Sequence, residues 1–280
     1  MSTRIVTDST CDLPAEMAEK FGIRIIPNYI NIGEKSFLDG VDISHEEFYK
    51  GLPNFPAHPK TSAPGSGMFS SVYQQLANEG ARHIISLHIH SGLSNLSNAA
   101  RVGAEAIQGV QITVLEVGQL ALGLGFMALA AAQAALDGMP TTEIIDGIRN
   151  QDRRTIIYAA LNTLDYLRES GRAPGLLVGV AKLLRIKPII QLHKGVLRLA
   201  GQVRTGSKSI DWLASGLKKL GRLNKVAVLH THAPERAEIL AGRIHRLLPT
   251  NKKILISEVT PILGVHIGPG AVGLACVNAE

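Results

Sequence analysis

Short apolar segments and longer amphipathic segments alternate along most of the chain. Residues 82–90 form a brief apolar run that predicts a buried strand, and residues 95–107 repeat small and apolar side chains at helical spacing. The same order occurs at the start of the chain, where a strand at residues 4–6 precedes a helix that Asp12 and Pro14 begin. This alternation predicts an α/β fold whose N-terminal part is a mostly parallel sheet with helices on both faces.

The second half of the chain indicates a different arrangement of strands. Residues 187–191 and 196–203 predict a hairpin, whose two strands are antiparallel, and residues 176–184 predict a helix. We therefore expect two α/β domains, residues 1–150 and residues 151–280, the second with a mixed or antiparallel sheet.

Three further segments predict a strand, a loop and the start of a helix. Residues 23–32 read as a single strand, and the proline-rich residues 53–64 predict an irregular loop that carries Thr61 and Ser62. Ser44 and Glu47 have the spacing of a helix capping box.

Hydroxyl side chains gather directly after predicted strands and in the proline-rich loop. The three clusters are Ser9 with Thr10, Thr61 with Ser62, and the turn Ser91-Gly92-Leu93-Ser94. Each cluster alone is readily explained as a helix cap or a turn. Together they are more informative, because the carboxyl ends of parallel strands meet at one edge of a sheet, where hydroxyl and N–H groups can hold a carboxylate or a phosphate. The 82–107 unit is the centre of this hypothesis.

Composition narrows the classes of function. The chain has 280 residues and 45% apolar composition, which is ample for a large core. Its net charge is +6, but the basic residues are dispersed and aromatic residues make up only 4%, which argues against nucleic-acid binding. Two cysteines give no disulfide framework and favour a reducing cytoplasm. We expect no stable membrane insertion, because the longest apolar run, residues 120–132, is too short to cross a bilayer and instead predicts a closely packed internal helix.

The sequence contains partial signs of several catalytic and cofactor sites. Ser91 is a candidate nucleophile of an esterase or acyl hydrolase, with Asp8, His88 and His90 as candidate partners, but no Gly-x-Ser-x-Gly elbow occurs in the chain. The two histidines can also ligate a metal only with further ligands that the sequence does not place. Two glycine-rich patterns lack the strand-to-helix context of a dinucleotide site, and no phosphate-binding Walker motif occurs. We expect no metal and no cofactor.

A basic stretch lies in the second half of the chain. Residues 170–210 contain eight Lys or Arg residues and no Asp or Glu. Most such runs are solvated faces, and the alternative is a docking surface for an acidic partner or a phosphate.

Six short motifs, in this order and spacing, resemble the DegV family of bacterial fatty-acid-binding proteins over nearly the whole chain. They are Thr7-Asp8-Ser9-Thr10-Cys11-Asp12-Leu13-Pro14, Lys60-Thr61-Ser62-Ala63-Pro64, Ser91-Gly92-Leu93-Ser94, Ser170-Gly171-Arg172, Lys187-Pro188-Ile189-Ile190 and His266-Ile267-Gly268-Pro269-Gly270. The resemblance implies a two-domain protein that buries a long-chain fatty acid and presents it to a separate fatty acid kinase, which makes an acyl phosphate for phospholipid synthesis. It implies that Thr61, Ser91 and His266 hold the carboxylate and that Arg172 faces the kinase.

The chemistry of such a ligand is consistent with the residues. A carboxylate removed from water has to regain hydrogen bonds, which Thr61, Ser62, Ser91, Ser94, the N–H of Gly92 and a protonatable histidine supply. Burying a sixteen-carbon tail contributes on the order of 10 kcal/mol before ordering costs, at about 0.8 kcal/mol per CH₂.

The chain departs from the family pattern at two places near the expected pocket. Asn95-Leu96-Ser97 stands where Gly-Thr-Tyr is usual, and Glu116-Val117-Gly118-Gln119 replaces a polar Asp-Ser/Thr turn. These changes bear on which fatty acid is preferred. The expected function is thus a non-enzymatic lipid carrier, with a serine esterase using Ser91 and a small-anion sensor as rivals.

Overall fold

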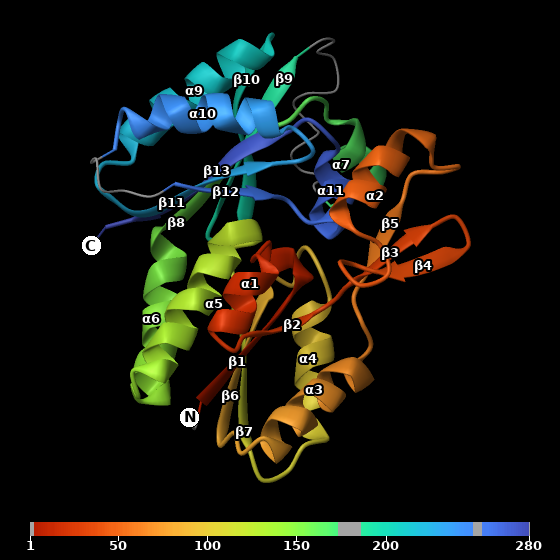
Figure 1. Ribbon diagram of the computed structural model, residues 1–280, viewed down its shortest axis with the longest axis vertical. Coiled ribbons are helices and arrows are strands. Elements are labelled where there is room, and N and C mark those ends of the chain that lie inside the picture. Colours follow the sequence, from red (N-terminus) through yellow and green to blue (C-terminus); the bar gives the residue numbers. More distant parts are fainter. Residues whose placement is uncertain (1–2, 173–185, 249–253, 280) are drawn as a thin grey trace.

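The structure, a computed structural model, describes residues 3–172, 186–248 and 254–279. Its framework is two β-sheets, the N-terminal one below and the C-terminal one above in Figure 1, with a small third sheet beside them. The α/β fold predicted from the sequence is confirmed.

The N-terminal sheet and its helices come from residues 3–154. Their bounds are β1 (Thr3–Asp8), η1 (Ser9–Cys11), α1 (Ala15–Lys20), β2 (Arg24–Ile26), α3 (Ser66–Asn78), β6 (His83–Ile89), α4 (Leu96–Glu105), β7 (Gln111–Val117), α5 (Ala121–Leu136) and α6 (Thr141–Arg154). The four strands are all parallel, in the order β2-β1-β6-β7. Helices α3 and α4 cover one face and α5 and α6 the other (Figure 1), so both faces are buried as expected for a parallel sheet.

The C-terminal sheet has six strands in the order β10-β9-β8-β13-β11-β12. The bounds of its strands and helices are β8 (Thr155–Ala160), β9 (Lys187–His193), β10 (Val196–Val203), α9 (Gly206–Lys219), β11 (Leu223–His230), α10 (Pro234–His245), β12 (Leu255–Glu258) and β13 (Val272–Asn278). Only β11 and β12 pair in parallel, so the sheet is mixed, and the predicted β9–β10 hairpin is present. Helices α9 and α10 lie side by side on one face (Figure 1).

A small antiparallel sheet, three short α-helices and one 3-10 helix fill the space beside the two large sheets. These elements are β3 (Tyr29–Ile32), β4 (Lys35–Leu38), α2 (His45–Gly51), η2 (Leu52–Asn54), β5 (Lys60–Ser62), α7 (Asp165–Ser170) and α11 (Pro261–Ile267). The strands pair in the order β4-β3-β5, and α11 packs on β3, β5 and α2. Residues from both ends of the chain thus meet at this sheet.

Helix α5 joins the two large sheets into one core. It is buried on almost every side, as the sequence predicted for this alanine-rich segment, and its cluster includes Leu192, Leu229 and Ala275 of the C-terminal sheet. Small side chains allow this closeness: a Cβ at Gly125 would lie 2.7 Å from the Cys11 carbonyl oxygen. The C-terminal sheet is therefore covered by α5 on one face and by α9 and α10 on the other.

Two predictions from local pattern were wrong. The segment 23–32 is two strands in different sheets, because Pro27 has no N–H to continue the ladder and Asn28 is turned inward, its side chain donating to Asp8 and Ser9. Thr61 and Ser62 lie in β5 and not in a loop. Local sequence gave no sign of this strand, because the hydrogen bonds that define it are made with β3, about thirty residues away.

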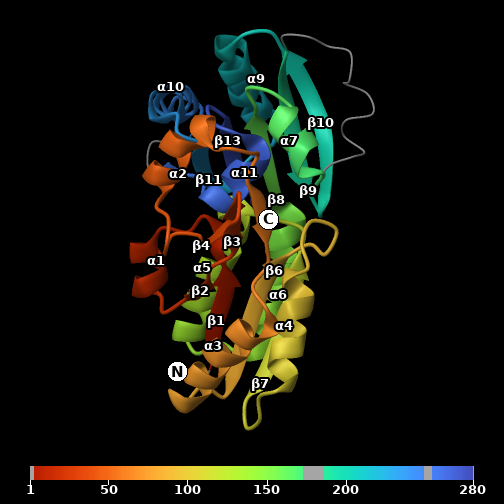
Figure 2. The ribbon, with the colours of Figure 1, turned by 90° about the vertical axis from the view of Figure 1, so that its right-hand side faces the viewer.

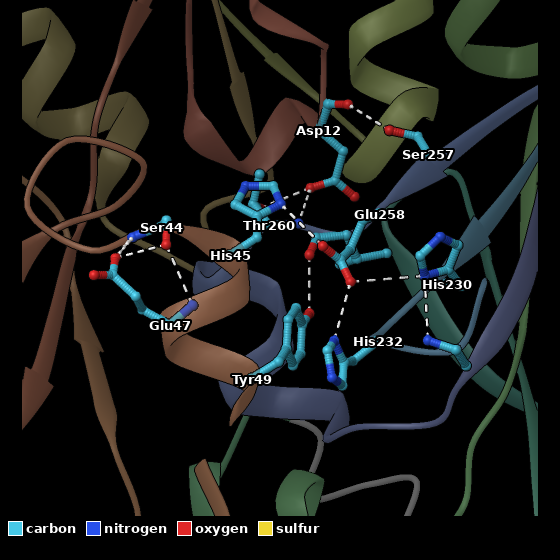
Figure 3. A network of polar contacts seen from close by, with 12 residues as sticks. Asp12, Ser44, His45, Glu47, Tyr49, His230, His232, Ser257, Glu258 and Thr260 are labelled. Atoms are coloured by element: carbon cyan, nitrogen blue, oxygen red, sulfur yellow. Dashed lines mark hydrogen bonds and ion pairs between the residues drawn. The ribbon is translucent and has the colours of Figure 1, made fainter. Parts of the chain in front are cut away.

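Of the other local predictions, the capping box is confirmed, and one helix and the domain boundary are not tested. The capping box at the start of α2 is present, with Ser44 Oγ accepting from the Glu47 N–H and the Glu47 carboxylate accepting from the Ser44 N–H (Figure 3). The helix expected at 176–184 lies outside the described residues. The boundary proposed near residue 150 falls in the last turn of α6 and stays a prediction.

Candidate functional site

A cavity of about 150 Å³ lies where β5, α11 and the turn after β6 face the C-terminal sheet. Its lining is mostly aliphatic and comes from both large sheets. The aliphatic residues include Ile89, Leu93, Leu96, Leu120, Ile157, Ile190, Leu192, Leu197, Leu229, Ile262, Leu263 and Ile267. Such a lining offers an alkyl chain the same surroundings as a protein core.

Thr61 and His266 form a polar pair in the lining of this cavity. Thr61 Oγ1 lies 3.1 Å from His266 Nε2, within hydrogen-bonding distance. Strand β5 positions the threonine by pairing Thr61 with Ile30, and the last turn of α11 positions the histidine. Ser62 also lines the cavity, and its hydroxyl accepts from the Asn31 side chain.

His266 is held in its neutral form. Burial lowers the pKa of its imidazole to about 4, and the charges of Arg172 and His58 act in the same direction. The second ring nitrogen, Nδ1, is buried without a hydrogen-bond partner among the described residues. A neutral imidazole has one donor and one acceptor nitrogen, so His266 can accept from Thr61 and still donate from Nδ1, or the reverse.

A network of polar contacts fixes the start of α11 (Figure 3). Asp12 Oδ1 accepts from the N–H and the hydroxyl of Thr260, at 3.0 and 2.7 Å, and the Tyr49 hydroxyl donates to the Val259 carbonyl at 2.9 Å. Asp12 adopts a left-handed backbone conformation that turns its carboxyl toward the helix. Burial raises the pKa of Asp12 to about 8, although the hydrogen bonds from Thr260 oppose this rise.

Three histidines surround Glu258 in the same network (Figure 3). The Nδ1 atoms of His45, His230 and His232 lie 3.8, 3.9 and 3.6 Å from the Glu258 carboxylate. His230 also lines the cavity. Sequence analysis missed this group, because its members come from α2, β11 with its following turn, and β12, and no spacing in the chain relates them.

The turn Ser91–Ser94 is divided between the cavity and solvent. Leu93 and Ser94 line the cavity, whereas Ser91 and Gly92 are exposed and do not. The N–H and hydroxyl of Ser91 both donate to Glu116 Oε1, each at 2.9 Å. The structure therefore brings Thr61, Ser62, Ser94 and His266 to one cavity, and the carboxylate-holding role of Ser91 and Gly92 stays a prediction.

Asp8 and His88 belong to a fully buried chain of hydrogen bonds and not to a nucleophilic site at Ser91. The Tyr73 hydroxyl donates to Ser86 Oγ, which lies 2.7 Å from His88 Nε2, and His88 Nδ1 lies 2.7 Å from Asp8 Oδ2. Ser86 is completely buried, so no substrate reaches its hydroxyl. Asp8 also positions Thr10 at the cavity wall, because Thr10 donates from its N–H and its hydroxyl to Asp8 Oδ1.

Arg172 lies at the rim of the cavity. Its side chain is exposed and contributes to the cavity lining, and its charge helps to lower the pKa of His266. Part of the basic stretch, residues 173–185, lies outside the described residues.

A family model described as "Uncharacterised protein, DegV family" matches residues 2–279. The chain belongs to the DegV family. A DegV domain-containing protein of Streptomyces coelicolor is 35% identical over 273 residues, which cover 96% of each chain.

Solved DegV structures share the fold. A DegV family protein from Thermus thermophilus, described for its fatty acid binding, superimposes with a TM-score of 0.92 at 27% identity, covering 100% of both chains. DegV of Bacillus subtilis, described as a fatty acid binding protein, gives a TM-score of 0.90 at 25% identity, covering 99% of this chain and 100% of its own.

Two features are absent from the described part of this DegV chain. It contains no helix with the length and apolar character required to traverse a bilayer. It also contains no group of three or more His, Cys, Asp or Glu side chains suited to a metal ion.

Proposed function

We propose that this DegV chain binds one long-chain fatty acid, with the carboxylate at Thr61 and His266 and the acyl tail along the aliphatic lining of the cavity. The observation that carries the proposal is the Thr61–His266 hydrogen bond in the wall of an otherwise largely aliphatic cavity. The fatty acid binding described for the Thermus and Bacillus relatives supports it.

The head group is recognised by hydrogen bonds. The Ser94 hydroxyl supplies one donor, and the Thr61–His266 pair supplies another. This second donor is the Thr61 hydroxyl when Nε2 carries the ring proton, or Nδ1–H when Thr61 donates to Nε2. An ionised carboxylate in a cavity needs this compensation, because leaving it without hydrogen bonds costs several kcal/mol.

The tail supplies most of the affinity. A cavity of about 150 Å³ is the size that holds a benzene ring, so a sixteen-carbon tail has to push the lining side chains apart. Those side chains come from the N-terminal part of the chain, from α11 and from the C-terminal sheet.

We further propose that the chain acts as a carrier and that a separate fatty acid kinase phosphorylates the bound acid. The exposed position of Arg172 at the cavity rim, beside the neutral pair that holds the carboxylate, supports this role. A basic face also steers an acidic partner or a phosphorylated ligand toward the rim.

Native mass spectrometry of protein purified from bacteria tests the proposal. We expect a co-purifying fatty acid in the native chain. Thr61→Val, which keeps the shape and removes the hydroxyl, is expected to weaken binding roughly 10- to 100-fold, the value of about 1.5–3 kcal/mol for a hydrogen bond to a charged group. Thr142→Val, at an exposed position on α6, is the matched control and should bind normally.

Two results contradict the proposal. Equal retention by Thr61→Val and the control excludes the head-group assignment. A ligand-free native chain that hydrolyses p-nitrophenyl esters, with the activity lost in Ser91→Ala, supports the esterase hypothesis in its place.

The carrier role is tested by Arg172→Ala. This variant should retain the fatty acid but slow its phosphorylation by a fatty acid kinase, and unchanged phosphorylation would remove Arg172 from that role.

A further inference from the structure

Glu116 on β7 holds the turn that separates the cavity from solvent. Its Oε1 accepts from the N–H and the hydroxyl of Ser91, each at 2.9 Å, and its Oε2 accepts from Ser97 Oγ at 3.0 Å. Ser97 is in the first turn of α4. One carboxylate therefore ties together β7, residues 91–94 and the start of α4.

Two basic side chains flank the same carboxylate. His90 Nε2 lies 3.6 Å from Oε1, and Arg101 Nη2 lies 3.6 Å from Oε2. Partial burial raises the pKa of Glu116, but the hydrogen bonds from Ser91 and Ser97 and the nearby His90 outweigh burial and leave the pKa below its ordinary value. Glu116 is therefore ionised at neutral pH, and its hydrogen bonds are charge-assisted.

Residues 91–94, which we call the gate turn, are part of the cavity wall. Ser91 and Gly92 are exposed, and Leu93 and Ser94 line the cavity. The tip of the β9–β10 hairpin lies against this region (Figure 2): the Gly195 N–H donates to the Gly118 carbonyl at 2.9 Å. A Cβ at Gly195 would be 3.0 Å from the His90 ring, so a side chain there would require the ring to shift.

The hydrogen bonds of Glu116 connect the two places where the sequence departs from the family pattern. Ser97 belongs to one departure and Glu116 to the other. The Ser97–Glu116 and Ser91–Glu116 hydrogen bonds make the two changes one structural unit. Because both donors of Ser91 are used by Glu116, the gate turn is fixed from within the protein.

We propose that Glu116 is a positioning residue that keeps the gate turn closed over the cavity and so limits the rate at which a fatty acid enters and leaves. This inference rests on the proposed function. Moving the gate turn outward breaks two hydrogen bonds between Ser91 and an ionised carboxylate, and the return of the turn restores them. Removing the charge lowers this barrier for both directions of ligand movement, so the two rates rise together and the equilibrium affinity changes little.

Stopped-flow fluorescence with cis-parinaric acid measures both rates on the full chain. Mixing the acid with the protein gives the association rate, and displacing the bound acid with excess oleic acid gives the dissociation rate. In Glu116→Gln we expect association and dissociation to accelerate by about five- to tenfold, consistent with weakening charge-assisted hydrogen bonds, with Kd changed less than about twofold. Ser97→Ala, which removes one of the hydrogen bonds to Glu116, should show a smaller change in the same direction. Glu105→Gln removes a carboxylate from the exposed far end of α4, the helix that contains Ser97, and should leave both rates unchanged.

A second measurement needs no ligand. Hydrogen exchange of the amides of residues 91–95 should be faster in Glu116→Gln than in Glu105→Gln, while protection of β6 stays the same. Unchanged ligand rates in Glu116→Gln overturn the inference, and so does a slower dissociation or a change confined to Kd. If the unaltered chain binds neither fatty acid, the proposed function fails, and the exchange measurement still decides whether Glu116 restrains the gate turn.

Discussion

His266 shows how one residue combines burial with recognition. In the structure its imidazole is neutral, because burial outweighs its ordinary tendency to protonate near pH 6.5 and the Arg172 charge adds to that effect. Its contact with Thr61 uses one nitrogen and leaves the other for a ligand. A carboxylate beside the ring opposes the effect of burial on the pKa, since an opposite charge favours the imidazolium form.

Ligand binding should therefore raise the pKa of His266 above its value of about 4 in the free protein. Titration of the histidine ring signals by NMR, with and without oleic acid, measures this change. The ring signals of His245, exposed on α10, are the control and should have the same positions with and without oleic acid. A His266 titration that oleic acid leaves unaltered would contradict the placement of the carboxylate.

Asp12 gives a pH dependence of stability at the residue scale. Its pKa is raised to about 8 by burial, so between about pH 4 and pH 8 the folded state binds more protons at this position than the unfolded state. The free energy of unfolding therefore falls as the pH rises through that range. Asp39, whose pKa burial raises to about 7, contributes with the same sign.

Asp12→Asn should flatten this dependence. Asparagine keeps an oxygen that accepts from Thr260, tolerates the left-handed backbone of this position, and does not titrate. Urea unfolding at about pH 5 and pH 8 should show a smaller loss of stability in the variant, with a gain on the order of 1 kcal/mol at the higher pH. The exposed control Glu34→Gln should keep the original slope, and an equal slope in Asp12→Asn would show that the carboxyl does not titrate in this range.

At the scale of elements, the site depends on two short segments that have little stability alone. Strand β5 has three residues and α11 has seven. Helix α11 is held at its start by Asp12 and Tyr49 and packs on β3, β5 and α2. Tertiary contacts rather than helix propensity fix the position of His266.

A pair of glycine substitutions tests this dependence on packing. Gly264 is in α11, and a Cβ there would lie 2.5 Å from Tyr49 Oη; Gly147 is in α6, where a Cβ would meet nothing within 4 Å. Gly147→Ala should stabilise the protein by about 0.5–1 kcal/mol, as expected for an open helix position.

Gly264→Ala should instead destabilise by about 1–3 kcal/mol through overpacking and weaken fatty acid binding. Thermal unfolding of the two variants beside the unaltered chain measures the contrast. If Gly264→Ala stabilised the protein like Gly147→Ala, α11 would not be tightly packed against α2.

At the scale of the whole molecule, the cavity wall is shared by both large sheets. Ile89 and Leu96 come from the N-terminal part, while Ile157, Leu192 and Leu229 come from the C-terminal sheet. Helix α5 and the hydrogen-bonded network around Thr260 connect the same two parts. A bound acyl chain adds contacts to both parts at once.

Fatty acid binding should therefore stabilise the chain as one unit. At a free ligand concentration of about 100 Kd the gain is about 2.7 kcal/mol, so calorimetry should show one unfolding transition that moves to a higher temperature. Thr61→Val at the same oleic acid concentration should show a smaller shift. Two transitions, of which the ligand moves only one, would show that the cavity belongs to one sheet alone.

The sequence by itself determined the α/β class, the parallel character of the first sheet, the β9–β10 hairpin, the cap of α2 and the internal position of α5. These features depend on period, turn residues and local hydrogen bonds, which neighbouring residues encode. The family motifs also singled out Thr61 and His266, but nothing in local sequence gives the distance between residues 205 positions apart.

Only the tertiary structure decided which of the candidate groups meet. It placed Thr61 in a strand, because β3 supplies the hydrogen bonds that the proline-rich segment lacks. In it Ser91 is hydrogen-bonded to Glu116 and His88 to Asp8, and three histidines lie around Glu258. Long-range pairings of polar groups depend on the final arrangement of distant elements, and burial then decides their charge, so neither can be read from the chain one segment at a time.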